Sequence, residues 1–277
     1  MPKINRDSSL HQARSDTPFL IALGVIGGFY VVMILAMLVA DATYTSPRNF
    51  WNALQSAEIR YAIKLSLFSC TVTTLLALFV AVPIGYLMSH YRFFGKNLLD
   101  GILDIPIVLP PLVIGLSLLI LFQTPLLRSF DRDFFPVTYE IPAVILAQFM
   151  VACAFAVRTV RTSFDQINPR AEQVALTLGC SRSQAFWRIV LPEARRGVVS
   201  AATIAWARAL GEFGPILVFA GTTRMKTEVL ASTVFLEMST GNIEAAVAVS
   251  LLMVCAAVVV LVIVRGYGGE RTIGRYL

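Results

Sequence analysis

Two oppositely charged residues lie four positions apart in a stretch that is otherwise uncharged. Arg208 and Glu212 are the only Lys, Arg, Asp or Glu residues between Val198 and Gly221. Residues four positions apart fall on the same face of a helix, where a cation and a carboxylate can pair. If the stretch crosses a membrane, each charge costs about 2.5–3.5 kcal/mol at the centre of the helix. We therefore expect the pair to face protein or water rather than lipid.

The sequence leaves two interpretations of this pair open. It can be a structural ion pair that holds the stretch against a neighbouring helix. Alternatively, the face that carries it lines or gates a path through the membrane, with Gly211 and Gly214 allowing another helix to come close.

Other residues that could take part in catalysis or metal binding are few and scattered. The four cysteines do not have the spacing of metal ligands, and neither His11 nor His90 neighbours a cluster that could hold a metal, so we interpret both histidines as solvated interfacial residues. The motifs H-E-x-x-H, G-x-S-x-G and G-x-x-x-x-G-K-[ST] do not occur. The sequence predicts no catalytic residue, no metal site and no cofactor, and no P-loop with which this chain could hydrolyse ATP.

The composition predicts the elements that position these residues. Of the 277 residues, 57% are hydrophobic and 14% are charged, whereas soluble domains carry about 25% charged residues. This excludes a soluble enzyme, a coiled coil and a disordered chain. Apolar runs long enough to cross a hydrocarbon core of about 30 Å as a helix predict an all-α polytopic membrane protein with about six transmembrane helices. The expected spans are Phe19–Ala40, Leu65–Ser89, Ile105–Phe122, Ile141–Val157, Val198–Gly221 and Ala245–Val264.

The positive charges predict the topology. With the N-terminus in the cytoplasm, fifteen of the 23 Lys and Arg residues lie inside, seven lie outside and Arg208 lies within a span. Because positive residues favour cytoplasmic loops, both termini are expected there. The predicted parts are a cytoplasmic segment at 1–18, a membrane domain at 19–264 and a cytoplasmic tail at 265–277. The basic charge is thereby explained without nucleic acid as a partner.

The predicted cytoplasmic loop at 158–197 carries seven of the fifteen inside charges. Asn168-Pro169 is a helix-start signal, and a short helix is expected from Pro169 to about Leu178. Gly179 suits a left-handed C-cap, Ser181 can cap a second helix, and Pro192 is expected to stop or bend it. From periodicity alone, this segment can also be an ordinary amphipathic loop.

The spacing within this loop resembles the EAA loop of ABC importer permeases, in which E-A-A is followed by Gly after three residues and by I-x-L-P after nine more. Gly179 and the run from Ile189 to Pro192 match in register, whereas Gln173 stands where the family has Glu. The resemblance implies a coupling helix that seats in a cleft of an ATPase subunit. The residues assigned to it are Glu172, Gln173, Val174, Ala175, Leu178, Gly179, Ile189, Leu191 and Pro192.

Two further stretches resemble molybdate and tungstate permeases. Residues 105–115, IPIVLPPLVIG, are similar to the opening of one of their spans, and residues 207–214, ARALGEFG, are similar to a second run. Here Pro215-Ile216 replaces the usual Ala-Thr. The candidate pathway or gate residues are Arg208, Glu212, Gly211, Gly214, Pro110 and Pro111.

The resemblance implies a permease subunit of an ATP-driven importer with the type I ABC importer fold, carrying molybdate or tungstate. It implies a homodimer of permeases in the lipid of a bacterial or archaeal cytoplasmic membrane. It also implies two cytoplasmic ATPase subunits that bind ATP and an extracytoplasmic substrate-binding protein. The alternatives are an ABC permease for sulfate or another small solute, and a self-contained secondary transporter. A secondary transporter usually has further intramembrane acids or an internal repeat, and the sequence has no convincing sign of either.

Overall fold

A computed structural model describes residues 17–268 as a set of helices, with no strand among them. Most of the two predicted cytoplasmic ends, together with His11, lies outside these residues. The chain divides into two compact units, Met1–Ser46 and Pro47–Leu277. The first contains α1 (Thr17–Tyr44), which includes the whole first predicted span.

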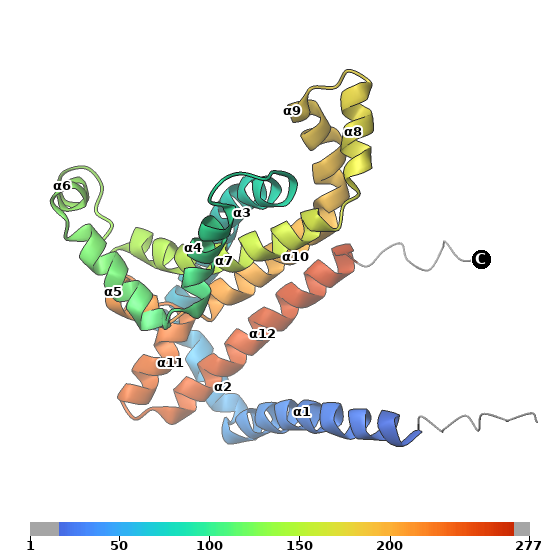
Figure 1. Cartoon of the computed structure of the whole chain (residues 1–277). Helices are drawn as coiled ribbons and strands as arrows, with labels where there is room; N and C mark the ends of the chain where they lie inside the picture. Colours follow the sequence, from blue (N-terminus) through green and yellow to red (C-terminus); the bar gives the residue numbers. More distant parts are fainter. Residues whose placement is uncertain (1–16, 269–277) are drawn as a thin grey trace, which may run out of the picture. The chain divides into compact units, whose positions relative to one another are not determined.

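The second unit contains the remaining helices (Figure 1). In chain order they are α2 (Pro47–Gln55), α3 (Ala57–His90), α4 (Lys96–Val108), α5 (Pro111–Phe122), α6 (Pro125–Asp133), α7 (Ile141–Asp165), α8 (Pro169–Thr177), α9 (Arg182–Ala185), the π-helix η1 (Phe186–Val190), α10 (Leu191–Leu210), the π-helix η2 (Ile216–Ala220), α11 (Leu230–Ser239) and α12 (Ile243–Gly268).

Four described helices, α1, α3, α7 and α12, are long and apolar enough to cross a membrane, and they correspond to the first, second, fourth and sixth predicted spans. A fifth is added if the bent pair α4 and α5 forms one span. The all-helical membrane fold is confirmed. The bent pair corresponds to the third predicted span, whereas 198–221 is not among these candidate spans, and neither stretch is one continuous helix.

The third predicted span, 105–122, is not one helix. α4 and α5 meet at an angle of 111°, with Leu109 and Pro110 extended between them at ψ 139° and 134°. A residue before proline is pushed out of the helical region, and proline has no N–H to donate. Because Pro110 is followed by Pro111, the helix stops and restarts there. These prolines therefore break the helix completely.

The fifth predicted span, 198–221, is also broken. α10 ends at Leu210 with Gly211 as its C-cap, and a short irregular segment leads through Pro215 to η2. At its other end, α10 follows η1 directly, so that Pro192 lies in its first turn. Of the two outcomes expected at Pro192, a stop is wrong, because the helical backbone continues through it. The preceding turn is a π-helix, in which the Leu191 N–H donates to the Phe186 carbonyl five residues back.

The core of the second unit forms where α3, α7 and α10 pack together. Their contact faces are rich in buried alanine, including Ala77, Ala152 and Ala205. A Cβ built on Gly85 of α3 would lie 2.8 Å from Cγ1 of Val160 in α7. Small residues of this kind let membrane helices approach closely.

α3 has two further features. It continues through Pro83 without ending. Near its other end, the buried Ser66 hydroxyl accepts a hydrogen bond of 2.8 Å from the backbone N–H of Leu230, the first residue of α11. This bond fixes the start of α11 to α3.

Candidate functional site

The segment between α7 and α10, residues 166–190, forms a helix, a glycine turn and a second helix; we call it the α8–α9 loop. The side chain of Asn168 accepts a hydrogen bond from the N–H of Arg170 and caps α8, whose first residue is Pro169. At the other end, the Gly179 N–H donates to the Leu176 carbonyl at 3.1 Å and the Cys180 N–H to Ala175 at 3.0 Å. This is a complete Schellman closure, and it needs the positive φ of 89° found at Gly179.

The second helix of the loop begins as expected at Ser181. The Gln184 N–H donates to the Ser181 hydroxyl at 3.2 Å, and the Ser181 N–H donates to Oε1 of Gln184 at 2.9 Å, which is a capping box. The predicted arrangement of helix, glycine turn and helix is therefore confirmed. Figure 1 shows α8 and α9 at the end of the second unit far from α11.

The α8–α9 loop has an inner and an outer face. Ala175 is buried, and Ile189 and Leu191 are half-buried, so these three predicted coupling residues pack inward. Val174 and Leu178 are 56% and 80% exposed, and Trp187 is 64% exposed. Gln173, Gly179 and Pro192 are also exposed. Large apolar side chains at such exposure offer a contact surface.

Glu172 lies on the inner face, where its two carboxylate oxygens have different partners. Oε1 accepts a hydrogen bond of 2.6 Å from the Tyr86 hydroxyl, and Oε2 lies 3.4 Å from Nε2 of His90. The His90 side chain is only 12% exposed, so the interpretation of His90 as a solvated interfacial residue is wrong. These contacts could not be predicted from the sequence, because 86 residues separate Tyr86 from Glu172.

The charge pair singled out in the sequence forms at the end of α10. Nη2 of Arg208 lies 3.3 Å from Oε2 of Glu212, whose side chain is 2% exposed, whereas that of Arg208 is 34% exposed. The guanidinium also lies over the ring of Phe155, 5.5 Å from its centroid. The pair therefore packs against α7, and Arg208 retains access to the surface.

The two broken helices interlock; we call this contact the broken-helix junction, formed by residues 111–115 and 214–218. A Cβ on Gly115 would lie 2.7 Å from Cα of Pro215, and one on Gly214 would lie 2.9 Å from Cβ of Pro111. By contrast, Gly211 has no such neighbour closer than 3.8 Å. Of the six predicted pathway residues, Pro111 and Gly214 make this contact and Gly211 does not.

Gln148 of α7 is a buried polar residue that the sequence analysis missed. Its Nε2 donates to the Ala209 carbonyl of α10 at 3.1 Å, and its Oε1 accepts from the Thr73 hydroxyl of α3 at 3.2 Å. One side chain therefore joins the three core helices. The only sequence signal for this buried contact is that Gln148 is a single glutamine in an otherwise apolar span.

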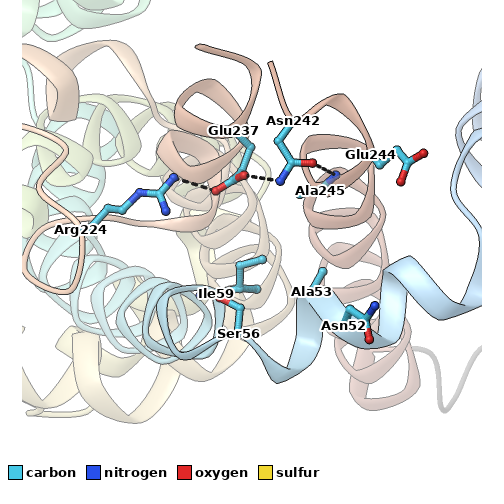
Figure 2. A pocket seen from close by; sticks show the side chains of 9 residues that line it. All are labelled: Asn52, Ala53, Ser56, Ile59, Arg224, Glu237, Asn242, Glu244 and Ala245. Atoms are coloured by element: carbon cyan, nitrogen blue, oxygen red, sulfur yellow. Dashed lines mark hydrogen bonds and ion pairs between the residues drawn. The ribbon is translucent and has the colours of Figure 1, made fainter. Parts of the chain in front are cut away.

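A pocket of about 360 Å³ lies among α2, the start of α3, α11 and α12 (Figure 2). Within it, Glu237 accepts hydrogen bonds from Arg224 at 2.8 Å and from Asn242 at 2.9 Å. Glu228, which follows Arg224 in the same loop, is fully buried, and neither of its carboxylate oxygens has a hydrogen-bond partner. Burial raises the pKa of Glu228. The nearby Thr233 hydroxyl and Arg224 oppose this effect, and the like charges of Glu237 and Glu58 add to it.

The apolar helices, the broken-helix junction and the exposed α8–α9 loop define a polytopic helical membrane protein. Solved transporters share this fold. A chain of a bacterial alginate ABC transporter aligns with a TM-score of 0.73 at 18% identity, covering 92% of this chain and 94% of its own length. A chain of the MetNI methionine ABC transporter aligns with a TM-score of 0.59 at 18% identity, covering 77% and 98%.

Residues 81–268 match the family described as "Binding-protein-dependent transport system inner membrane component", and the chain belongs to this family. It is 32% identical to the molybdenum transport system permease protein ModB of Mycobacterium tuberculosis, over 94% of this chain and 97% of ModB. It is also 32% identical to the molybdate/tungstate transport system permease protein WtpB of Thermococcus kodakarensis, over 97% and 99%. The sulfate transport system permease protein CysT of Escherichia coli is 29% identical, over 92% and 95%.

Proposed function

We propose that this chain is the permease subunit of an ATP-driven importer for an oxyanion, molybdate or tungstate. The observation that carries the proposal is the α8–α9 loop, with its Schellman closure at Gly179 and its exposed Val174, Leu178 and Trp187. Relatives named for molybdate and tungstate transport match almost the whole chain. Sulfate is the second candidate substrate, and the similarity to CysT favours it.

In this proposal, residues 19–264 form the membrane domain and both termini are cytoplasmic. Two copies of the chain lie side by side and form the pathway. An ATPase subunit docks on each α8–α9 loop, and an extracytoplasmic binding protein delivers the anion. The chain itself hydrolyses nothing and holds no cofactor, since ATP binds to the partner. Apart from membrane lipid, no further partner and no nucleic acid is required.

Transport would proceed by alternating access. ATP-driven closure of the ATPases displaces the docked loops, and the permease subunits move with them. The proposal assigns the opening and closing of the path to a rearrangement of α5 and α10 at the broken-helix junction, and it leaves both interpretations of the Arg208–Glu212 pair open. Backbone that is not helical is tolerated at membrane depth only against protein or a water-filled cavity.

Reconstitution with an ATPase and a binding protein, sought among the genes that neighbour the gene of this chain, tests the proposal. We expect ATP-dependent uptake of labelled molybdate that unlabelled tungstate suppresses. Uptake of labelled sulfate in preference to molybdate would identify the second candidate. Ion-gradient-driven uptake by the chain alone would identify a secondary transporter.

The docking surface has its own test. The Leu178→Asp variant is expected not to co-purify with the ATPase, because the substitution places a charge in an apolar contact. Phe94→Asp is the matched control, because Phe94 is fully exposed between α3 and α4, outside the loop. Gly179→Asp is expected to weaken coupling, because a side chain at the positive φ of 89° strains the Schellman closure, while the chain still inserts, because nothing lies within 4 Å of that side chain. Unchanged ATPase activity in the Gly179→Asp complex would contradict the docking assignment.

A further inference from the structure

Glu172 is the point at which α8 is tied to a membrane helix. Its bond to Tyr86 and its contact with His90 are the only hydrogen bonds or ion pairs between α8 and another helix in the part of the chain that the structure describes. Both partners lie in the last turns of α3. A hydrogen bond to a carboxylate is about twice as strong as one between neutral groups.

Aromatic packing surrounds this bond. The Tyr86 ring lies 4.5 Å from that of His90, 4.8 Å from Phe186 in η1 and 5.7 Å from Phe164 at the end of α7. We call Tyr86, His90, Phe164, Glu172 and Phe186 the Tyr86 cluster. It joins the C-terminal ends of α3 and α7 to both arms of the α8–α9 loop.

The two faces of α8 separate two tasks. Val174 and Leu178, four positions apart, face outward, and Gln173 is exposed beside them. Glu172 and Ala175, three positions apart, face inward. The carboxylate nearest in sequence to the acidic position of the loop therefore points to the membrane helices and away from the docking surface.

α8 has only nine residues, and isolated helices of that length are marginal in water. Its position therefore depends on what it is tied to. A partner that displaces Val174 and Leu178 also displaces the Glu172 carboxylate on the opposite face of α8. The end of α3 is bonded to that carboxylate.

We propose that Tyr86 and His90 are positioning residues for energy coupling, which transmit displacement of α8 to α3 through Glu172. This rests on the proposed function, in which an ATPase drives the loop. Glu172 then acts within the permease, and the docking surface consists of the exposed residues on the other face of α8.

The contact is tested first on the chain alone. Thermal unfolding of Tyr86→Phe, Glu172→Gln and the double variant forms a double-mutant cycle. Tyr86→Phe keeps the ring packing and removes only the hydroxyl, so the chain is expected to fold. We expect the loss in Tm from the second substitution to be at least halved once the first is present. Additive losses would overturn the proposal without reference to any partner.

The coupling role is tested in the reconstituted complex by the ratio of molybdate imported to ATP hydrolysed, or of sulfate if the unmodified complex carries that ion. Tyr86→Phe and His90→Gln are expected to retain the ATPase and to lower this ratio about fivefold, the low end of typical coupling between sites. Tyr61→Phe is the control, since it removes a hydroxyl bonded to the Lys226 carbonyl near the opposite end of α3. An unchanged ratio in Tyr86→Phe would overturn the proposal.

Glu172→Gln distinguishes transmission from docking. We expect the ATPase to remain bound while the transport ratio falls. Loss of the ATPase from this variant would make Glu172 a docking residue and would overturn the proposal. Failure of the unmodified chain to bind an ATPase would instead contradict the proposed function, and that result is obtained before any variant is compared.

Discussion

Gly214 lies so close to Pro111 that a Cβ atom on the glycine would come within 2.9 Å of Cβ of the proline. The same hypothetical atom would lie 3.1 Å from the backbone nitrogen of Leu112, and a backbone atom cannot move aside as a flexible side chain can. The break before α5 therefore packs directly against the break after α10, and no room is left for a side chain at Gly214.

Gly214→Ala is expected to destabilise the chain by about 1–3 kcal/mol, the usual cost of over-packing a close contact. Thermal unfolding in detergent measures this loss, at about 2–4 °C for each kcal/mol in a chain of this size. Gly211→Ala is the control, because its Cβ would have 3.8 Å of clearance. Equal melting temperatures for the two variants would contradict the close packing.

Arg208→Met is expected to destabilise the chain by about 3 kcal/mol or more, because it leaves the Glu212 carboxylate buried without its partner. Glu212→Gln should cost less, since Arg208 retains access to the surface. The double variant should recover part of the loss, as measured by thermal unfolding. Uptake assays separate the two interpretations of the pair. Normal transport by folded Arg208→Met and Glu212→Gln variants would rule out a gating role.

Gln148→Met is expected to cost about 1 kcal/mol, the net value of an ordinary hydrogen bond. The cost is small because Thr73 can still donate to the Ile145 carbonyl and Ala209 still accepts from the Glu212 N–H. Gln148→Ala should cost more, because it also opens a cavity among α3, α7 and α10. Gln166→Met, at the exposed end of α7, is the control. If all three variants unfold at one temperature, Gln148 does not join the core helices.

Glu228→Gln is expected to raise the melting temperature at pH 8 by about 2 °C or more. Burial holds the pKa of Glu228 above its ordinary value of 4.5. A raised pKa in the folded state means that the neutral acid stabilises the fold at low pH, and this stability is lost as the pH rises through that pKa. The advantage of the glutamine should therefore grow between pH 5 and pH 8. Glu237→Gln, which weakens the contacts of Arg224 and Asn242, should lower the melting temperature instead.

Local signals predicted most of the helices and the architecture of the α8–α9 loop. The Asn168-Pro169 start, the glycine at 179 and the Ser181 cap act within a few residues, so the sequence contains all the information that they need. The continuity of the spans was harder to predict. Hydropathy reports length and polarity, whereas the break at Pro110 and the end of α10 at Gly211 depend on backbone geometry.

The contacts of the candidate site were beyond prediction for a different reason. Glu172 meets Tyr86 across 86 residues, and Gln148 meets Thr73 across 75. Sequence spacing predicts only neighbours on one helix, as it did for Arg208 and Glu212. The same limit explains why two motifs recognised separately, the paired prolines and the glycines after Arg208, gave no sign that they touch each other.

α3 connects Ser66, which holds the start of α11, to Tyr86, which holds α8. Twenty residues of helix separate them, or about 30 Å. Pro83 lies three residues before Tyr86, and a proline inside a helix removes one backbone hydrogen bond. α3 therefore lacks one backbone hydrogen bond between the residue that holds α11 and the residue that holds α8, and this is where the helix bends most easily. If α8 drives transport as proposed, the bending of α3 at Pro83 would set how much of the displacement of α8 reaches α11.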